Sequence, residues 1–301
     1  MTPELDGFNG VFYPCDKPSR SAMILMLGDS SDDRLAVTGA KWVHSTGCHA
    51  LAMSPGKKDY GHHNYPLERF GAAIDFLKAR GISKIGIAGA STTGMLALIA
   101  ASYYSDITLT IAISPSDFVM EGFYQDGLDG MRERPGAGES TVTWKGEPLP
   151  YLPFAYRHPE YWLKIQEESR AGADMIASRQ MFDESERRHP LREDEKIKVE
   201  RIRGHILFIG AEDDVLWDTC KYIRRMEDRL EELTHECTYI SLIYEHGTHF
   251  AFPESMLRMM MGPAGDLLPL VFRAGRKFPA ECKAVREDID NKMQEAIQAW
   301  K

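Results

Sequence analysis

A serine stands between an apolar strand pattern and an apolar helix pattern, with space for only one sharp turn between them. Residues 84–88 predict a short buried strand, and residues 94–100 predict a helix that is apolar on nearly every side. Ser91 lies on the turn, and the small residues Gly89 and Ala90 precede it. A turn this sharp is strained and accepts only small neighbours. It would hold the hydroxyl of Ser91 above the end of the strand, where other groups can reach it.

The rest of the chain alternates between strand and helix patterns. Short apolar runs predict strands at residues 10–13, 22–27, 49–53, 84–88, 109–113, 205–209 and 238–244. Amphipathic patterns predict helices at residues 67–80, 218–233 and 281–301. Such alternation is typical of a mostly parallel sheet with helices on both faces. We therefore predict a single α/β domain over residues 1–301.

Charge and cysteine content exclude several classes of function. The chain has 36 basic and 45 acidic residues, and its net charge of −9 argues against nucleic acid or an anionic membrane as a partner. No apolar run approaches the ~20 residues of a membrane span, and residues 1–6 lack the pattern of a signal peptide. The five scattered cysteines have no metal-ligand spacing and indicate reduced thiols in a cytoplasm. We expect no metal and no cofactor, and the oligomeric state stays open.

Two aspartates follow the predicted strand at residues 205–209. Asp213 and Asp214 both lie just past its end, where a carboxylate can orient a catalytic base. We favour Asp214 as that acid and keep Asp213 as the fallback. The aspartate that is not used would cap the helix that follows.

Two histidines follow the last predicted strand, at residues 238–244. His249 comes after the small residues Gly247 and Thr248 and is the preferred base. His246 is the fallback base. A loop in this place can bring an imidazole over the turn that carries the serine.

The order Ser91, Asp214, His249 is that of the catalytic triad of α/β-hydrolases, and the turn at Ser91 resembles their nucleophile elbow. In such a triad His249 takes the proton of Ser91 as the hydroxyl attacks a carbonyl carbon. Asp214 orients the imidazole and stabilises its positive charge. This order weighs against the simpler interpretation, in which Ser91 only caps a helix.

The backbone near Ser91 supplies candidates for an oxyanion hole. The amide of Thr92 lies at a helix N-terminus, where it can stabilise a negative oxygen. A second donor would come from Gly28 or Asp29, in the loop after the strand at residues 22–27. The elbow pattern G-x-S-x-G ends here in Thr93 instead of glycine, although a glycine follows directly.

Residues 118–203 interrupt the alternation of strands and helices. They fall between strands 6 and 7 of the α/β-hydrolase fold, where enzymes of this fold carry a cap. Aromatic residues in or near this insertion are candidates for a substrate pocket: Trp144, Tyr151, Phe154 and Trp217. Aromatic residues in a cap can equally form a small core of its own. A methionine cluster at residues 256–261 is interpreted first as packing, and second as the wall of an adaptable acyl pocket.

Several segments together are more specific than the elbow alone. They are Gly-Ala-Ser at 89–91, Trp-Lys-Gly-Glu-Pro-Leu-Pro-Tyr at 144–151, Asp-Asp-Val-Leu-Trp at 213–217, and the loop of His249. In this order the chain resembles the catalytic domain shared by acyl-CoA thioesterases and bile-acid-CoA:amino acid N-acyltransferases. The resemblance extends from about Ala22 to the closing helix. It implies that the second aspartate, Asp214, is the acid.

The chain differs from that family in two respects. Larger members carry an N-terminal β-sandwich domain, for which this sequence has no room. The transferase members use cysteine where this chain has Ser91. A thioester acyl-enzyme reacts readily with amines, whereas the oxygen ester of a serine is commonly hydrolysed by water. The resemblance therefore implies a hydrolase.

Three hypotheses follow for the function. The first is a serine hydrolase that cleaves acyl thioesters such as acyl-CoA. The second is a carboxylesterase or a peptidase-like hydrolase of the same fold, acting on an oxygen ester or an amide. The third is a hydrolase fold without activity that serves in binding. It predicts the loss of a triad residue, yet all three are present.

Overall fold

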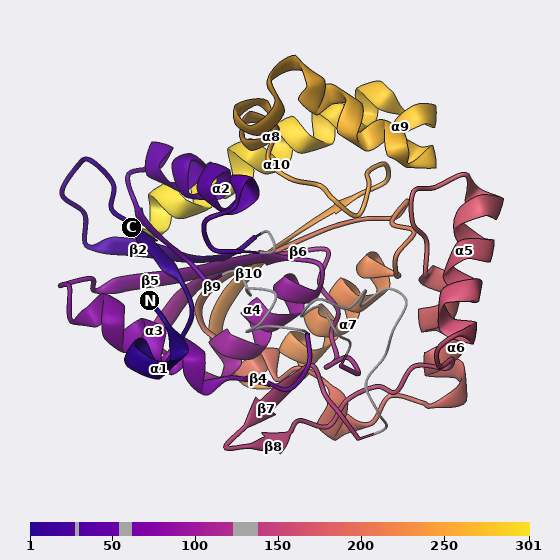
Figure 1. Ribbon diagram of the computed structural model, residues 1–301, viewed down its shortest axis with the longest axis horizontal. Helices are drawn as coiled ribbons and strands as arrows, with labels where there is room; N and C mark the ends of the chain where they lie inside the picture. The colour runs from indigo at the N-terminus through magenta and orange to yellow at the C-terminus, as the bar shows by residue number, and fades with distance from the viewer. Residues whose placement is uncertain (28–29, 54–61, 123–137) are drawn as a thin grey trace.

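The computed structural model describes residues 1–27, 30–53, 62–122 and 138–301. Within these residues the strands form two sheets, one of seven strands and one of three. The larger sheet runs through the middle of the molecule, with helices on both of its faces (Figure 1). This is an α/β-hydrolase fold, and the fold class predicted from the sequence is confirmed.

The strands of the central sheet correspond to the apolar runs of the sequence. They are β1 (Val11–Tyr13), β2 (Ser21–Met26), β3 (His49–Ala52), β5 (Lys84–Ala90), β6 (Ile107–Ile113), β9 (Arg203–Ala211) and β10 (Glu236–Tyr244). Their order is β1-β3-β2-β5-β6-β9-β10, and only the pairing of β1 with β3 is antiparallel. Parallel strands bring their carboxyl ends to one edge of the sheet. Residues that follow β5, β9 and β10 can therefore meet at that edge.

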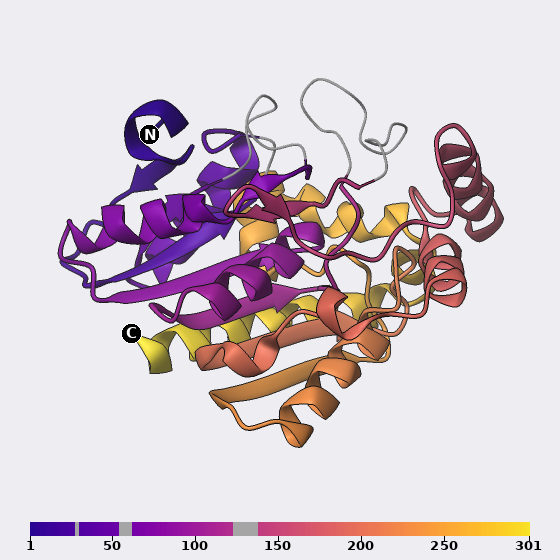
Figure 2. The ribbon, with the colours of Figure 1, turned by 90° about the horizontal axis from the view of Figure 1, so that it is seen from below.

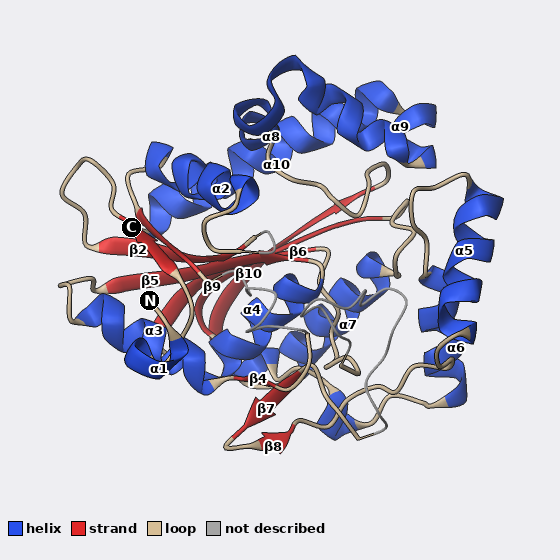
Figure 3. Cartoon of the chain, viewed as in Figure 1, coloured by secondary structure: helices blue, strands red, loops and turns tan. Residues whose placement is uncertain are grey.

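Figure 3 separates the strands from the helices that cover the two faces. One face carries α2 (Arg34–Ser45), α8 (Glu254–Met261) and α10 (Pro279–Trp300), seen above the sheet. The other face carries α3 (Glu68–Lys78), α4 (Thr92–Tyr103) and α7 (Thr219–Glu232). Each face has its own hydrophobic core. Among the described residues, no helix is both long enough and apolar enough to cross a bilayer.

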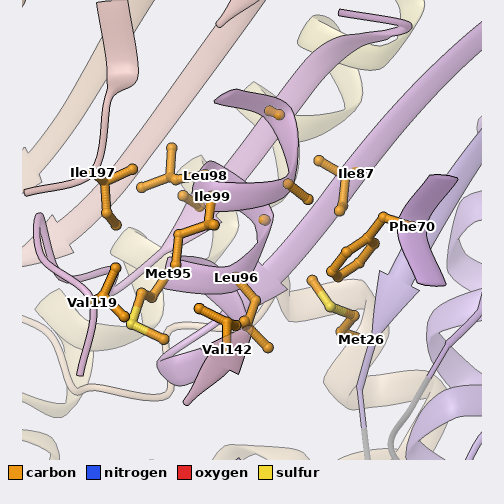
Figure 4. Packing of buried hydrophobic residues seen from close by; sticks show 14 of the residues in the cluster. Met26, Phe70, Ile87, Met95, Leu96, Leu98, Ile99, Val119, Val142 and Ile197 are labelled. Atoms are coloured by element: carbon orange, nitrogen blue, oxygen red, sulfur yellow. The ribbon is translucent and has the colours of Figure 1, made fainter. Parts of the chain in front are cut away.

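The helix α4 lies in the centre of the larger core, which explains why it is apolar all round. It packs on β5 and β6, and Met95 and Leu96 are completely enclosed (Figure 4). Val119, Val142 and Ile197, which come from the segment between β6 and β9, belong to the same core. Each large apolar side chain buried in this way stabilises the fold by ~1.5–3 kcal/mol. The start of α4, and with it Ser91, is thereby fixed.

The segment between β6 and β9 contributes elements that the sequence analysis did not resolve. Its helices are α5 (Glu160–Gly172) and α6 (Arg179–Arg188), which lie at one end of the molecule in both views (Figures 1 and 2). Its strands are β7 (Val142–Trp144) and β8 (Glu147–Pro148). Together with β4 (Tyr65–Pro66), they form the small second sheet.

The thiols provide a test of this packing. Burial raises the pKa of Cys48 and Cys237, and it raises the pKa of Cys220 to about 12 and of Cys282 to about 11. Because the thiolate is the reactive form, these four side chains should react slowly in the folded protein. Cys15 is only half-buried. We expect a chromogenic disulfide reagent to modify one thiol quickly in the native protein and five after unfolding. Fast reaction of two or more native thiols would contradict the packing.

Candidate active site

Ser91 occupies a left-handed turn between β5 and α4. Its φ is 62° and its ψ is −131°, a conformation that costs free energy in any residue with a side chain. The amide of Ser91 donates to the carbonyl of Ile113 at 2.8 Å, which fixes the turn to β6. A Cβ atom at Gly89 would lie 2.1 Å from the carbonyl oxygen of Thr93. Glycine is therefore required two residues before the serine.

The threonine that departs from the usual elbow pattern has a role in the turn. The Thr93 hydroxyl accepts a hydrogen bond from the amide of Ala90 at 3.0 Å and lies 3.0 Å from the carbonyl of Met26. The close approach of α4 to the sheet takes place at Gly94, where a Cβ atom would be 2.8 Å from the carbonyl oxygen of Ile113. The next residue thus provides the space that the last glycine of the pattern usually provides.

The structure brings Ser91, His249 and Asp214 into one hydrogen-bonded chain. The Nε2 atom of His249 lies 2.7 Å from the Oγ atom of Ser91. The Nδ1 atom lies 2.8 Å from one carboxylate oxygen of Asp214 and 3.0 Å from the other. In the tautomer that satisfies both contacts, Nδ1–H donates to Asp214 and Nε2 accepts from Ser91. This is the arrangement in which an imidazole can remove a hydroxyl proton.

Burial strengthens the interaction between the imidazole and the carboxylate. The side chains of His249 and Asp214 are 0% and 1% exposed. Asp214 also accepts from the amide of Leu216 at 2.9 Å and from the hydroxyl of Thr219. A buried carboxylate needs such partners, because a buried polar group without hydrogen bonds is costly. Its hydrogen bonds thus hold Asp214 in a single orientation toward the imidazole of His249.

Arg179, at the start of α6, holds the loop that carries Asp214. Its guanidinium donates to the carbonyls of Glu212 and Asp214, both at 3.1 Å, and pairs with Asp218 at 2.5 Å. The amide of Ser178 donates to the carbonyl of Val215 at 3.0 Å. The insertion between β6 and β9 is therefore attached directly to the loop that carries Asp214. Arg179 could not be identified from the sequence, because the chain gives no local sign that α6 reaches this loop.

Ser114 is a second residue near the site that the sequence analysis missed. It follows β6 and adopts a positive φ of 47°. Its hydroxyl donates to the carbonyl of His249 at 2.9 Å, and its carbonyl accepts from the indole of Trp217 at 3.2 Å. The ring of Trp217 meets the imidazole of His249 edge to face, with centroids 4.5 Å apart. The only local signal is a serine directly after a buried strand.

The two fallback residues form a separate pair. Nδ1 of His246 donates to Asp213 at 2.9 Å. The imidazole of His246 also stacks on the ring of Phe278, with centroids 3.7 Å apart and an angle of 14° between the planes. Both side chains are partly exposed. His249 contacts Ser91 and is bonded to Asp214, whereas His246 and Asp213 bond to each other.

The candidate oxyanion donors are only partly within the described residues. Thr92 is the first residue of α4, and the amides of a first helical turn have no partner within the helix. Its amide therefore lies beside Ser91 at the positive end of a helix dipole. Gly28 and Asp29, the other two candidates, lie outside the described residues.

The four aromatic residues predicted for a pocket have different surroundings. Trp144 packs against Tyr103, with ring centroids 5.0 Å apart, at the far end of α4, roughly 18 Å along the helix from Ser91. The hydroxyl of Tyr151 accepts from the amide of Gly138 at 2.8 Å.

Phe154 and Trp217 are both buried and both contact Phe182 of α6, at centroid distances of 5.3 and 5.2 Å. Of the four predicted aromatic residues, Trp217 is the one that touches the imidazole of His249.

Residues 65–256 match the protein family described as BAAT / Acyl-CoA thioester hydrolase C terminal. The chain belongs to this family. The matched region covers more than half of the sequence and contains Ser91, Asp214 and His249. No curated protein matches the sequence.

Several solved structures are similar to the family member described here. Est1E from Butyrivibrio proteoclasticus with bound ferulic acid is 14% identical, with a TM-score of 0.45 over 96% of this chain and 95% of that one. The Pyrococcus furiosus esterase Pf2001 is 13% identical, with a TM-score of 0.49 over 100% and 94% of the two chains. DcsB in complex with its substrate analogue is 12% identical, with a TM-score of 0.49 over 97% and 94%.

The turn at Ser91 can be tested by a single added methyl group. Gly89→Ala should lower the free energy of unfolding by at least about 3 kcal/mol, because its Cβ would meet backbone atoms that no rotamer can move. Gly81→Ala is the control: it also adds a methyl group, at a φ of +79°, but nothing lies within 4 Å. It should cost only about 1 kcal/mol. Equal losses in urea unfolding would contradict the steric argument.

Proposed function

We propose that this protein is a serine hydrolase that cleaves acyl thioesters, with Ser91 as nucleophile, His249 as general base and Asp214 as the residue that orients the base. The observation that carries the proposal is the hydrogen-bonded chain from Ser91 Oγ through His249 to Asp214, with distances of 2.7 and 2.8 Å. Family membership supports the reaction class, because the family takes its description from acyl-CoA thioester hydrolysis.

The reaction proceeds in two halves. As Ser91 Oγ bonds to the carbonyl carbon, its proton passes to Nε2 of His249, and the carbonyl oxygen becomes negative. The amide of Thr92 donates to that oxygen. When the C–S bond breaks, His249 returns the proton to the leaving thiolate. Water then attacks the acyl-serine with the same help from His249, which releases the carboxylic acid and restores Ser91.

We propose that residues 118–203 act as a cap beside this centre. Support comes from Arg179, which bonds the acid loop, and from Phe182, whose ring meets Trp217 edge to face. Trp217 in turn contacts His249. These contacts would exclude water from the imidazole of His249 and hold it in position. Phe182 of the insertion, together with Trp217, would then shape the space in front of Ser91.

The choice of nucleophile supports hydrolysis over transfer. A serine ester reacts less readily with amines than a cysteine thioester, so water is the expected acceptor. We also propose a cytoplasmic location, supported by five cysteines that are all free. The substrate is a small molecule, and acyl-CoA is the class that the family suggests.

The test is release of free thiol from acyl-CoA esters, run beside p-nitrophenyl esters of matching chain length. Ser91→Ala should abolish turnover. Asp214→Asn should lower kcat on the order of 10³- to 10⁴-fold, because the amide cannot orient the base in the required tautomer. Asp213→Asn is the matched control, since it makes the same change at the neighbouring residue, and it should keep nearly full activity.

The outcomes separate the alternatives. Turnover of CoA esters that is lost in Ser91→Ala establishes a thioesterase. Turnover of nitrophenyl esters alone contradicts the thioester proposal and leaves an esterase. Loss of activity in Asp213→Asn, with Asp214→Asn still active, would assign the acid to the other aspartate. If neither ester class is turned over and Ser91 does not react with a fluorophosphonate, the enzymatic proposal is wrong.

A further inference from the structure

The carboxyl end of β6 bonds to all three segments that carry the proposed triad. The carbonyl of its last residue accepts from the amide of Ser91 at 2.8 Å. The next residue, Ser114, makes three further bonds. Its amide donates to the carbonyl of Ile209 in β9 at 2.8 Å, and its carbonyl accepts from the indole N–H of Trp217, in the loop after β9, at 3.2 Å. Its hydroxyl donates to the carbonyl of His249 at 2.9 Å.

The backbone of Ser114 has a conformation that its own sequence disfavours. Its φ of 47° lies in the left-handed region, which residues with a side chain rarely adopt. The following residue is Pro115, and proline favours an extended conformation in the residue before it. Ser114 is also only 1% exposed. Such strain persists only where surrounding contacts hold it, and it is concentrated at functional sites.

The loop of His249 depends on this serine for its main-chain contacts. Among the described residues, the hydroxyl of Ser114 is the one hydrogen-bond partner of the main chain of residues 246–252. The rings of Trp217 and Phe250 meet the imidazole of His249 edge to face, with centroids 4.5 and 5.2 Å away. These ring contacts restrict the tilt of the imidazole. The bond from Ser114 restricts the position of the backbone from which the imidazole extends.

We propose that Ser114 is a positioning residue, which acts through the main chain of His249 to keep Nε2 within hydrogen-bond distance of Ser91 Oγ. This inference rests on the proposed function and adds to it a residue outside the triad. A displacement of about 1 Å between reacting groups can lower a rate on the order of 100-fold. One hydrogen bond that fixes the backbone beside the base can therefore have a large effect on acylation.

Removal of the hydroxyl tests this role. Ser114→Ala leaves the buried carbonyl of His249 without its donor, so the loop should move to satisfy it. In pre-steady-state release of p-nitrophenol from p-nitrophenyl acetate, the acylation rate constant should fall at least about 10-fold. The dissociation constant of the substrate should change less than about 2-fold, because proton transfer and not binding is affected.

Ser116→Ala is the matched control. Ser116 lies two residues further along the chain, is 0% exposed, and donates its hydroxyl to the carbonyl of Phe118 at 2.8 Å. The same atoms are removed from an equally buried serine, but the bond that is lost does not reach the loop of His249. Acylation by this variant should stay within about 2-fold of the wild type.

Ser114→Gly separates positioning from stability. Alanine keeps the cost of the left-handed conformation, whereas glycine adopts it freely. Both variants lack the hydroxyl. Ser114→Gly should therefore unfold at a higher temperature than Ser114→Ala, yet lose acylation to the same extent. If Ser114→Ala fails to fold, as judged by circular dichroism, Ser114→Gly carries the kinetic test.

A crystal structure provides a readout that does not depend on activity. In Ser114→Gly the distance from His249 Nε2 to Ser91 Oγ should exceed about 3.2 Å, the upper limit of an ordinary hydrogen bond. In Ser116→Ala and in the wild type it should remain a hydrogen bond.

The outcomes distinguish this inference from the proposed function. Slow acylation in both Ser114 variants, with a displaced imidazole and normal Ser116→Ala, supports the positioning role. Wild-type acylation in Ser114→Gly, an equal loss in Ser116→Ala, or slow acylation with the imidazole in place overturns that role and leaves the hydrolase. If the wild-type protein hydrolyses no ester or thioester, the hydrolase is overturned, and the positioning role with it.

Discussion

The left-handed turn at Ser91 is the constraint on which the site depends. It requires a residue without a side chain at Gly89, because the first turn of α4 passes within contact distance of that Cα. It also requires Gly94, where α4 meets β6. Once these contacts are made, the hydroxyl of Ser91 can only lie at the carboxyl edge of the sheet. The carboxyl ends of β9 and β10 reach the same edge, and so Asp214 and His249 can meet it.

Much of this arrangement was predictable, because it follows from local patterns and from the geometry of parallel strands. Buried strands appear as short apolar runs, and residues just past their ends must gather at one edge. The choice between Asp213 and Asp214 was not decided by that argument, since both follow the same strand. In the structure, the amide of Leu216 and the hydroxyl of Thr219 bond to Asp214 and hold its carboxylate inward, where it contacts His249. Asp213 bonds to His246 instead.

The remaining features depend on contacts between distant parts of the chain, which a single sequence does not reveal. The strand β4 has two residues and pairs with β7, nearly eighty positions later. No periodicity can show so short a strand. Trp144 was expected near the substrate from its place in the insertion, yet it packs at the opposite end of α4 from Ser91. Position in the chain did not indicate which end of the helix it would meet.

The same strand explains why the two faces of the sheet differ. Along β5 the residues that face α4 are large until Gly89, whereas those that face α2 and α10 are Gly86, Ala88 and Ala90. The turn needs small residues directly before Ser91. It does not require a small residue at Ala88, which lies on the same face of β5 as Ala90, two residues earlier. A larger residue there would bury more apolar surface and would fill the small apolar cavity that Ala88 lines, between this face of the sheet and the helices α2 and α10. The small side chain at Ala88 is therefore not explained by the turn, and the cavity that it lines is a separate consequence of the sequence of β5.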